Sequence, residues 1–384
     1  MINNLSISNL LLTTVFLFLL IHYIIFLWRI SRGLKKLNLT TNTTLPHEFI
    51  SIIIPFRNEE ENILANLKSI ESQNYPQDKY EVIYVDDTSI DNSLSILKSN
   101  VKAKNIRILS VPRDFSQNAH KKRAIRYGIE NSKGGIIVTT DADCIHSKLW
   151  LISLIRSFDS ITGFVSGPVE FQFEENIFSK FQQLEFAGLV LCGAGLIGTG
   201  HPTICNAANI AYRRKVFDEV GGFKDQMNLS SGDDELLMQK VFKDTDFSVK
   251  FCIDKNAIVK TSVNKTIADF FQQRNRWASK GLFYSDRSLV LKLILIYLFY
   301  VGLIAQLFFS LFCHPIFFFS FILSIALKFL FEFLILYNGK KIIFDDLKLK
   351  YFIITEILQI PYILFAGIFG AFGNYLWKER KIKR

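Results

Sequence analysis

The sequence has few of the residues that build metal clusters and disulfide frameworks. Its 384 residues include five Cys and six His. The Cys are scattered, odd in number and without C-x-x-C spacing, which argues against a disulfide framework or a zinc site and suits a reducing compartment. Internal repeats and low-complexity tracts are also absent. Because His120, His146 and His201 share no metal-ligand spacing, we expect none of them to bind a metal.

Apolar residues and positive charge are plentiful. Apolar residues make up 49% of the chain, 37 of them Phe, and the excess lies at the two ends. The formal net charge is +10. The basic residues gather beside apolar runs, at 29–36 and 378–384, which favours membrane lipids over nucleic acid as the partner.

Four apolar runs are long enough to be membrane spans. The first, at about residues 10–28, has no positive segment before it and no small-residue cleavage site after it, which argues against a cleaved signal peptide. Four basic residues follow it directly, so the positive-inside rule places the next segment in the cytoplasm, at the cell (plasma) membrane. The other runs lie at about 289–312, 315–337 and 352–376.

The last apolar run allows two interpretations. If all four runs cross the membrane, the basic tail at 378–384 lies outside, against the charge rule. The run also contains Glu356, Gln359 and Pro361, so a re-entrant or interfacial segment that keeps the tail inside is equally open. The expected domains are a membrane helix with a basic linker at 1–47, a cytoplasmic domain at 48–285, and a C-terminal membrane region at 286–384.

Short apolar segments alternate with amphipathic ones in the middle of the chain. This alternation predicts an α/β fold: a mostly parallel sheet with helices on both faces. Ligands of such sheets bind beyond the carboxyl ends of the strands. Asn58 is expected to cap the first helix. The expected strands are 50–55, 80–85, 106–110 and 135–140, and the expected helices are 60–72, 91–99 and 121–131.

Acidic residues follow two of these strands. Asp86 and Asp87 come after the second strand, and Asp141 and Asp143 after the fourth. Side chains two apart on an extended strand point the same way, so Asp141 and Asp143 can serve one site. Hard oxygen ligands suit Mg²⁺ or Mn²⁺, with Asp143 on the metal and Asp141 toward a ribose or the metal.

These acids and one further string carry a family resemblance. The segment Gln273–Trp277 reads Gln-x-x-Arg-Trp, and Gly232 is followed by the acid pair Asp233 and Asp234. The chain resembles membrane-bound family 2 glycosyltransferases, a group that includes cellulose, hyaluronan and poly-N-acetylglucosamine synthases and ceramide-glucosyltransferase-like enzymes. The similarity runs from about Phe49 to Gly281. It implies the nucleotide-sugar-binding GT-A fold, flanked by transmembrane helices.

The resemblance implies which residues hold the donor. Asp87, beside Asp86, would accept the imide N–H of uracil, although Thr88 stands where the family usually has Gly. Lys121 would balance diphosphate charge; the alternative is a solvated basic helix face. Asp143 and Asp141 would hold the metal.

It also implies which residues serve the acceptor. Asp233 takes the place of the family's Glu, and Asp234 is then the general base, because adjacent acids raise one another's pKa. Trp277 would line the acceptor channel, unless it only anchors a helix at the headgroups. Further acceptor or diphosphate contacts are implied for Asn206, Asn209, Gln273 and Arg276, where a buried amide loop is the alternative for the two Asn.

The implied reaction is inverting transfer of a sugar from a nucleotide sugar, UDP-linked in this interpretation, to a lipid or glycan at the cytoplasmic face. A processive polysaccharide synthase is the nearest alternative. Such enzymes usually have a Phe-x-Val-Thr segment, and none follows Trp277, which favours a lipid-linked or short-chain acceptor. A metal-dependent nucleotidyltransferase is disfavoured by the Gln-x-x-Arg-Trp string, and a non-catalytic membrane scaffold by the intact acids.

Overall fold

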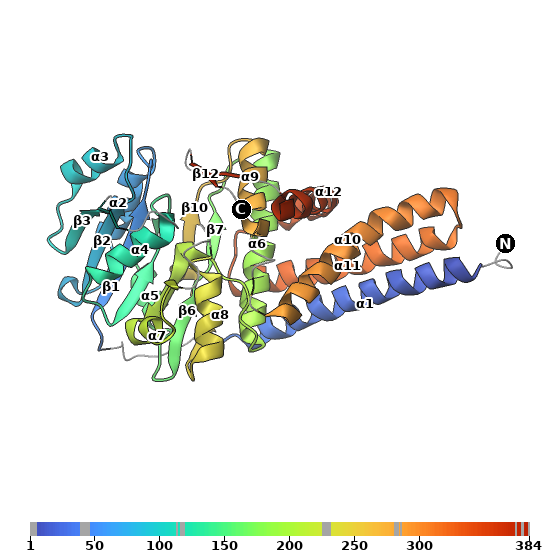
Figure 1. Ribbon diagram of the computed structural model, residues 1–384, viewed down its shortest axis with the longest axis horizontal. Coiled ribbons are helices and arrows are strands. Elements are labelled where there is room, and N and C mark those ends of the chain that lie inside the picture. The colour runs from blue at the N-terminus through green and yellow to red at the C-terminus, as the bar shows by residue number, and fades with distance from the viewer. Residues whose placement is uncertain are drawn as a thin grey trace.

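The computed structural model of the protein describes residues 6–38, 47–112, 114–115, 120–224, 232–279, 284, 286–372, 375–377 and 380–382. An α/β domain lies at one end of the molecule and a bundle of long helices at the other (Figure 1). The expected linker at 39–46 and parts of the expected basic tail, at 378–379 and 383–384, lie outside the described residues.

A seven-stranded sheet forms the centre of the α/β domain, in the order β3-β2-β1-β4-β8-β6-β9. β8 runs antiparallel to both neighbours and the other pairs are parallel, which confirms the expected mostly parallel sheet. The strands are β1 (Ile50–Phe56), β2 (Tyr80–Asp86), β3 (Ile106–Ser110), β4 (Ile136–Thr139), β6 (Thr162–Ser166), β8 (Ile210–Arg213) and β9 (Ser248–Phe251).

Helices cover both faces of this sheet. Along β1, Ile53 packs in one hydrophobic core while Ile52 and Ile54 pack in another, as the two-residue period of a strand requires. All seven residues of β1 are buried, so its near-continuous apolar run reflects two covered faces. The domain's helices are α2 (Ile63–Glu71), α3 (Ser93–Asn100), α4 (His120–Glu130), α5 (Trp150–Ile155), α7 (Arg214–Glu219) and α8 (Glu235–Asp244).

The loops after β1 and β2 correct one expectation. Asn58 does not cap a helix, because α2 begins only at Ile63. Asn58 instead has a φ of 52°, and its side-chain oxygen accepts the N–H of Ile90 at 3.0 Å. Thr88, where the family usually has Gly, also has a positive φ, 61°. The family's Gly would suit this backbone better, since β-branched residues rarely adopt it.

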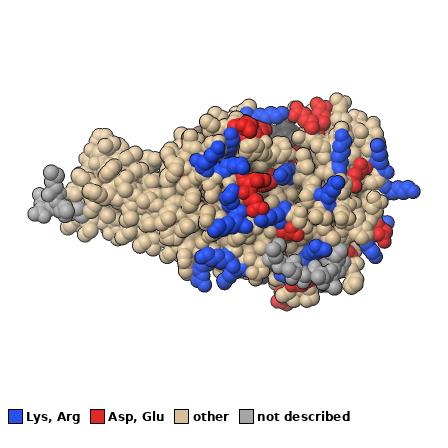
Figure 2. Space-filling view, turned by 180° about the vertical axis from the view of Figure 1, so that it is seen from behind, with Lys and Arg blue, Asp and Glu red and all other residues tan. Residues whose placement is uncertain are grey.

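Three long helices lie side by side in the bundle: α1 (Ile7–Lys36), α10 (Arg287–Phe312) and α11 (Ile316–Ile342) (Figure 1). Each is long and apolar enough to cross a membrane. Basic residues end two of them at the domain side, in the last turns of α1 and α11. Figure 2 shows Lys and Arg gathered where the bundle meets the domain, and the rest of the bundle bare of charge on that face.

The last apolar helix, α12 (Phe352–Phe372), runs in another direction. Figure 1 shows it nearly end-on beside the bundle, packed on α9 (Ile267–Ser279) and α6 (Ile177–Gly198). The predicted run to residue 376 is too long, because the helix ends at Phe372. Beyond it, β11 (Tyr375–Trp377) pairs antiparallel with β12 (Arg380–Ile382).

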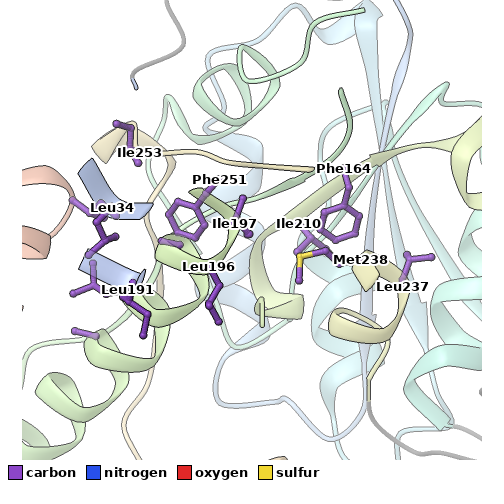
Figure 3. Packing of buried hydrophobic residues seen from close by; sticks show 14 of the residues in the cluster. Leu34, Phe164, Leu191, Leu196, Ile197, Ile210, Leu237, Met238, Phe251 and Ile253 are labelled. Carbon is purple, nitrogen blue, oxygen red and sulfur yellow. The ribbon is translucent and has the colours of Figure 1, made fainter. Parts of the chain in front are cut away.

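Helix α6 was not predicted, and it joins the two parts of the molecule. It is apolar enough to be a membrane helix, yet 67% of its apolar window is buried inside the protein. A Cβ on Gly33 of α1 would lie 1.7 Å from the carbonyl oxygen of Gly195 of α6, so this crossing requires glycine. Figure 3 shows one apolar cluster that runs from Phe164 in the sheet through Leu191 of α6 to Leu34 of α1.

A small second sheet, β5 (Ile145–His146), β10 (Val259–Thr261) and β7 (Val169–Phe171), buries a histidine. The ring of His146 contacts the hydroxyls of Ser69 at 3.1 Å and Thr140 at 2.8 Å. Burial lowers the pKa of His146 from 6.5 to about 3. His146 is thus neutral in the folded protein at any ordinary pH.

This buried ring predicts an acid-sensitive fold. The unfolded chain takes up a proton on His146 below pH 6.5 while the folded chain does not, so stability is complete above that pH and is lost as the pH falls toward 3. Between pH 7.5 and 5 the loss should be about 2 kcal/mol. Melting temperatures of detergent-solubilised protein should therefore depend less on pH in His146→Gln. The exposed His201 gives the matched control, His201→Gln, and an equal pH dependence in all three proteins would contradict the prediction.

Candidate active site

A cavity of about 840 Å³ brings together most of the predicted site residues. It reaches from the acids beyond β4 past α6 and α9 to the helices of the bundle. Residues far apart in the sequence therefore share one space. Nine predicted residues line it: Lys121, Asp141, Asp143, Asn206, Asp233, Asp234, Gln273, Arg276 and Trp277.

The two acids beyond β4 are placed by a turn and not by a strand. β4 ends at Thr139, and the N–H of Cys144 donates to the carbonyl of Asp141 at 3.2 Å. The argument from strand alternation is therefore wrong, although both carboxylates line the cavity. The hydroxyl of Thr261, on β10, lies 3.4 Å from Oδ2 of Asp143.

Lys121, in the first turn of α4, connects two of the acidic motifs. Its Nζ lies 2.6 Å from Oδ1 of Asp141 and 3.4 Å from Oδ2 of Asp233. Burial opposes the charge, but these carboxylates outweigh it and raise the pKa of Lys121 above its ordinary value. The lysine is therefore a permanent cation in the cavity wall, and the alternative of a solvated basic face is wrong.

Asp234 is held by two backbone groups. It caps α8, with Oδ1 accepting the N–H of Glu235 at 2.7 Å, while Oδ2 accepts the N–H of Ala207 at 3.0 Å. Gly232 just before it has a φ of 86°, which side chains rarely tolerate. The carboxylate is thus fixed at a helix N-terminus, beside the loop that carries Asn206.

The two arginines of α9 differ sharply. Arg276 lines the cavity and has no carboxylate partner among the residues that the structure describes. Arg274 is buried and pairs with Glu185 of α6, and its guanidinium lies 4.3 Å from the ring of Trp277. Arg276 therefore belongs to the cavity lining, whereas Arg274 holds α9 against α6 through a buried ion pair.

Asn209 lies inside the core and not in the lining of the cavity. It is fully buried, and its amide nitrogen donates to the carbonyls of Pro168 and Ala257, both at 2.8 Å. Its oxygen accepts the indole N–H of Trp150 at 3.0 Å. These bonds use the side chain inside the core, so the prediction for Asn209 is wrong and the alternative of a buried amide is correct.

Asp86 and Asp87 lie at the carboxyl end of β2, outside the lining of this cavity. Asp87 is buried and pairs with Arg123 of α4, whose Nε and Nη2 both lie 2.7 Å from Oδ1. Asp86 accepts the N–H of Ser89 at 2.9 Å. Their contact with the nucleotide base stays a prediction.

The charge of the cavity bears on metal binding. Asp141, Asp143, Asp233 and Asp234 line it, and a single lysine lies among them. An anionic diphosphate would be repelled here unless a cation accompanied it. No group of three His, Cys, Asp or Glu suited to a metal occurs within the described ranges. The pair Asp141 and Asp143 nevertheless fits Mg²⁺ or Mn²⁺, because such ions bind one or two carboxylates together with phosphate oxygens and water.

Comparison with known proteins agrees with this geometry. Residues 51–221 match the family profile described as Glycosyl transferase family 2. This segment of the chain is therefore a glycosyl transferase family 2 domain. It is 31% identical over 217 residues to the glycosyltransferase AglE of Haloferax volcanii, covering 55% of this chain and 66% of AglE. It is 24% identical over 242 residues to the poly-beta-1,6-N-acetyl-D-glucosamine synthase of Staphylococcus epidermidis, covering 61% of this chain and 55% of the synthase. The chain thus spans about two thirds or less of the length of these relatives.

A solved structure shares the fold of this family 2 glycosyltransferase. The mannosyltransferase PcManGT from Pyrobaculum calidifontis, solved with GDP-Man and Mn²⁺, aligns with a TM-score of 0.56 at 19% identity. The alignment covers 94% of this chain and 98% of PcManGT. It confirms the expected GT-A fold, and the helices that flank this domain are long and apolar enough to cross a membrane.

The sequence analysis did not identify the buried contacts that hold the Gln-x-x-Arg-Trp string in place. Glu185 accepts hydrogen bonds from Arg274 of α9 and, at 2.5 Å, from Tyr362 of α12. It also missed Glu235, whose carboxylate lines the cavity and accepts the hydroxyl of Tyr284 at 2.6 Å. Glu185 lies in an apolar segment of the sequence. A single acid in such a segment could have indicated a buried ion pair.

The contrast between the two arginines yields a prediction. Arg274→Ala should destabilise the protein by about 3–5 kcal/mol, because it leaves the carboxylate of Glu185 buried without its cation. Arg276→Ala should leave the melting temperature unchanged and weaken nucleotide-sugar binding about tenfold, the cost of one charge-assisted hydrogen bond. Thermal melts and titration calorimetry in detergent separate the two effects. Equal loss of stability in both variants would show that Arg276 is also part of the frame.

Proposed function

We propose that this protein transfers one sugar from a nucleotide sugar to a membrane-associated acceptor at the cytoplasmic face, with inversion at the anomeric carbon. The observation that carries the proposal is the continuity of the cavity. It joins the acids and Lys121 at one end to Trp277 and the membrane helices at the other. A soluble donor and a membrane-bound acceptor can therefore meet in one space.

Asp234 is the proposed general base. It removes the proton of an acceptor hydroxyl, and the acceptor oxygen forms a bond to the anomeric carbon as the bond from that carbon to the diphosphate breaks. Attack opposite the leaving diphosphate inverts the configuration. Lys121 and Arg276 stabilise the negative charge that develops on the departing diphosphate. Asn206 and Gln273 line the same space and are proposed to position the acceptor or the diphosphate.

A divalent cation is part of the proposal. Asp143 and Asp141 would hold Mg²⁺ or Mn²⁺, which when bound supplies positive charge to the leaving diphosphate. The acidic lining of the cavity supports this assignment. PcManGT, which shares the fold, was solved with Mn²⁺ and GDP-Man. The donor of the present protein is proposed to be UDP-linked, and a panel of radiolabelled nucleotide sugars tests that choice.

We propose that α1, α10 and α11 cross the membrane and that α12 lies along its cytoplasmic surface. Basic residues at the domain end of the bundle support this orientation under the positive-inside rule. α12 crosses the three-helix bundle steeply, so it does not follow the same path through the bilayer. This arrangement also keeps the C-terminal basic tail inside.

Asp234→Asn should cut transfer by a hundred- to ten-thousand-fold, as expected for loss of a general base. The affinity for the nucleotide sugar should change by less than about threefold. Because an amide would turn one N–H toward the backbone of Ala207 or Glu235, the melting temperature must be measured alongside. Asp233→Asn is the matched control and should weaken donor binding, since it faces Lys121. Transfer by Asp234→Asn within threefold of wild type would exclude it as the base.

The native Cys313 tests the orientation. It is exposed at the end of α10, in the turn that leads to α11. In a variant whose other Cys are Ser, an impermeant maleimide should label Cys313 in intact cells. A variant with Ser99→Cys as its single Cys, on the exposed surface of α3, should be labelled only after lysis. The reverse pattern would place the catalytic domain outside.

A further inference from the structure

The cavity has an apolar mouth on the side of the membrane helices. It is lined there by Leu293, Ile294 and Tyr297 of α10 and by Ile363, Gly367 and Ile368 of α12. Ile294 is 41% exposed and Ile368 is 51% exposed, although both line the cavity. The cavity therefore reaches the surface at these two isoleucines, beside the contact in which Tyr297 of α10 packs on Gly367 and donates to the carbonyl of Leu364 at 3.2 Å. Exposed isoleucines at an opening suit a hydrocarbon chain and not a hydrophilic polymer.

A second part of the same cavity is polar and lies among the membrane helices. Tyr23, Tyr300, Glu332, Glu356 and Gln359 line it. The hydroxyl of Tyr23 lies 2.5 Å from Glu332 and 3.0 Å from that of Tyr300, which in turn donates to Gln359 at 3.1 Å. Ionisable groups among membrane helices are costly, so this wall calls for a functional reason.

The polar groups of this part of the cavity indicate which kind of ligand it can bind. Lys328 is fully buried, pairs with Glu332 at 3.1 Å and with Glu356, and is not part of the lining. Here the cavity therefore meets carboxylate, amide and phenol oxygens, with the ammonium group of Lys328 behind them. Such a wall accepts hydrogen bonds from hydroxyl groups and offers aromatic rings to an apolar sugar face.

From these two observations we propose that the acceptor is a sugar already carried on a hydrocarbon chain. The chain leaves the cavity between α10 and α12, and the hydroxyls of the carried sugar bind the polar wall. The apolar mouth is assigned to this occupant because it is continuous with the cavity that holds Asp234. The inference rests on the proposed function and narrows its acceptor from lipids and glycans in general to a glycolipid.

The first test follows the transferred sugar. Membranes containing the protein are incubated with the radiolabelled nucleotide-sugar panel and extracted with organic solvent. The molecular mass of the labelled lipid is then measured by mass spectrometry. A labelled lipid with two or more sugars is the expected product. A lipid with the new sugar alone would overturn the sugar-bearing acceptor, and label confined to a water-soluble or insoluble polymer would overturn the hydrocarbon chain.

The second test blocks the apolar mouth of the cavity with larger side chains. Ile294→Trp and Ile368→Trp should each reduce lipid labelling at least tenfold, with nucleotide-sugar affinity unchanged within threefold. Leu298→Trp on α10 and Ile357→Trp on α12 are matched controls, because both residues are exposed, at 41% and 56%, and neither lines the cavity. The controls should retain normal labelling. Equal labelling by mouth and control variants would overturn the proposed path of the chain.

Nucleotide release separates this inference from the function on which it rests. If the wild-type protein releases no nucleotide from any donor of the panel, the proposed transferase function fails, and the inference fails with it. If nucleotide is released and the product is a polymer or a single-sugar lipid, the transferase function stands and the glycolipid inference alone is wrong.

Discussion

The architecture depends on one buried ion pair, Arg274 with Glu185. It fixes α9 against α6, and the hydroxyl of Tyr362 ties α12 to the same carboxylate. The guanidinium also lies over the ring of Trp277, so this ring of the cavity lining is positioned by the same cation. A buried ion pair repays its desolvation only when its geometry and hydrogen bonds are complete, which makes this junction intolerant of change. All three helices contribute residues to the lining of the cavity.

At the end of the cavity beyond β4, the charges of the acids and of Lys121 determine which ligands can bind. Lys121 balances part of the charge of Asp141 and Asp233. The remaining acids leave the space negative, and this favours an ion-assisted diphosphate over a bare one. Asp234 is held at a helix N-terminus by two backbone N–H groups and is therefore fixed in direction before any substrate binds. Asp141, Asp143, Asp233 and Asp234 thus form an acidic wall of the cavity in which Lys121 is embedded.

Much of the fold could be predicted because local patterns determine it. The predicted strand at 106–110 matches β3. Because both faces of the sheet are covered, a strand such as β1 appears in the sequence as a run of apolar residues. The site was predictable where motifs are short and contiguous. It failed at Asn209, because whether an amide faces a ligand or a core depends on Pro168, Ala257 and Trp150, which come from distant segments. Likewise, Asn58 is a residue type that often caps helices, but here it adopts a positive φ in a turn and accepts the N–H of Ile90.

By itself the sequence determined the α/β alternation, the apolar helices, the acidic motifs and the Gln-x-x-Arg-Trp string, because each is written in neighbouring residues. Only the tertiary structure decided which arginine of that string is buried in an ion pair, since Glu185 lies 89 positions away from Arg274 in the chain. It alone placed α6 between the domain and the bundle, through a backbone crossing at Gly33 and Gly195. It alone joined a polar wall and an apolar mouth to the acids, because a cavity is a property of packed helices and has no local sequence signal.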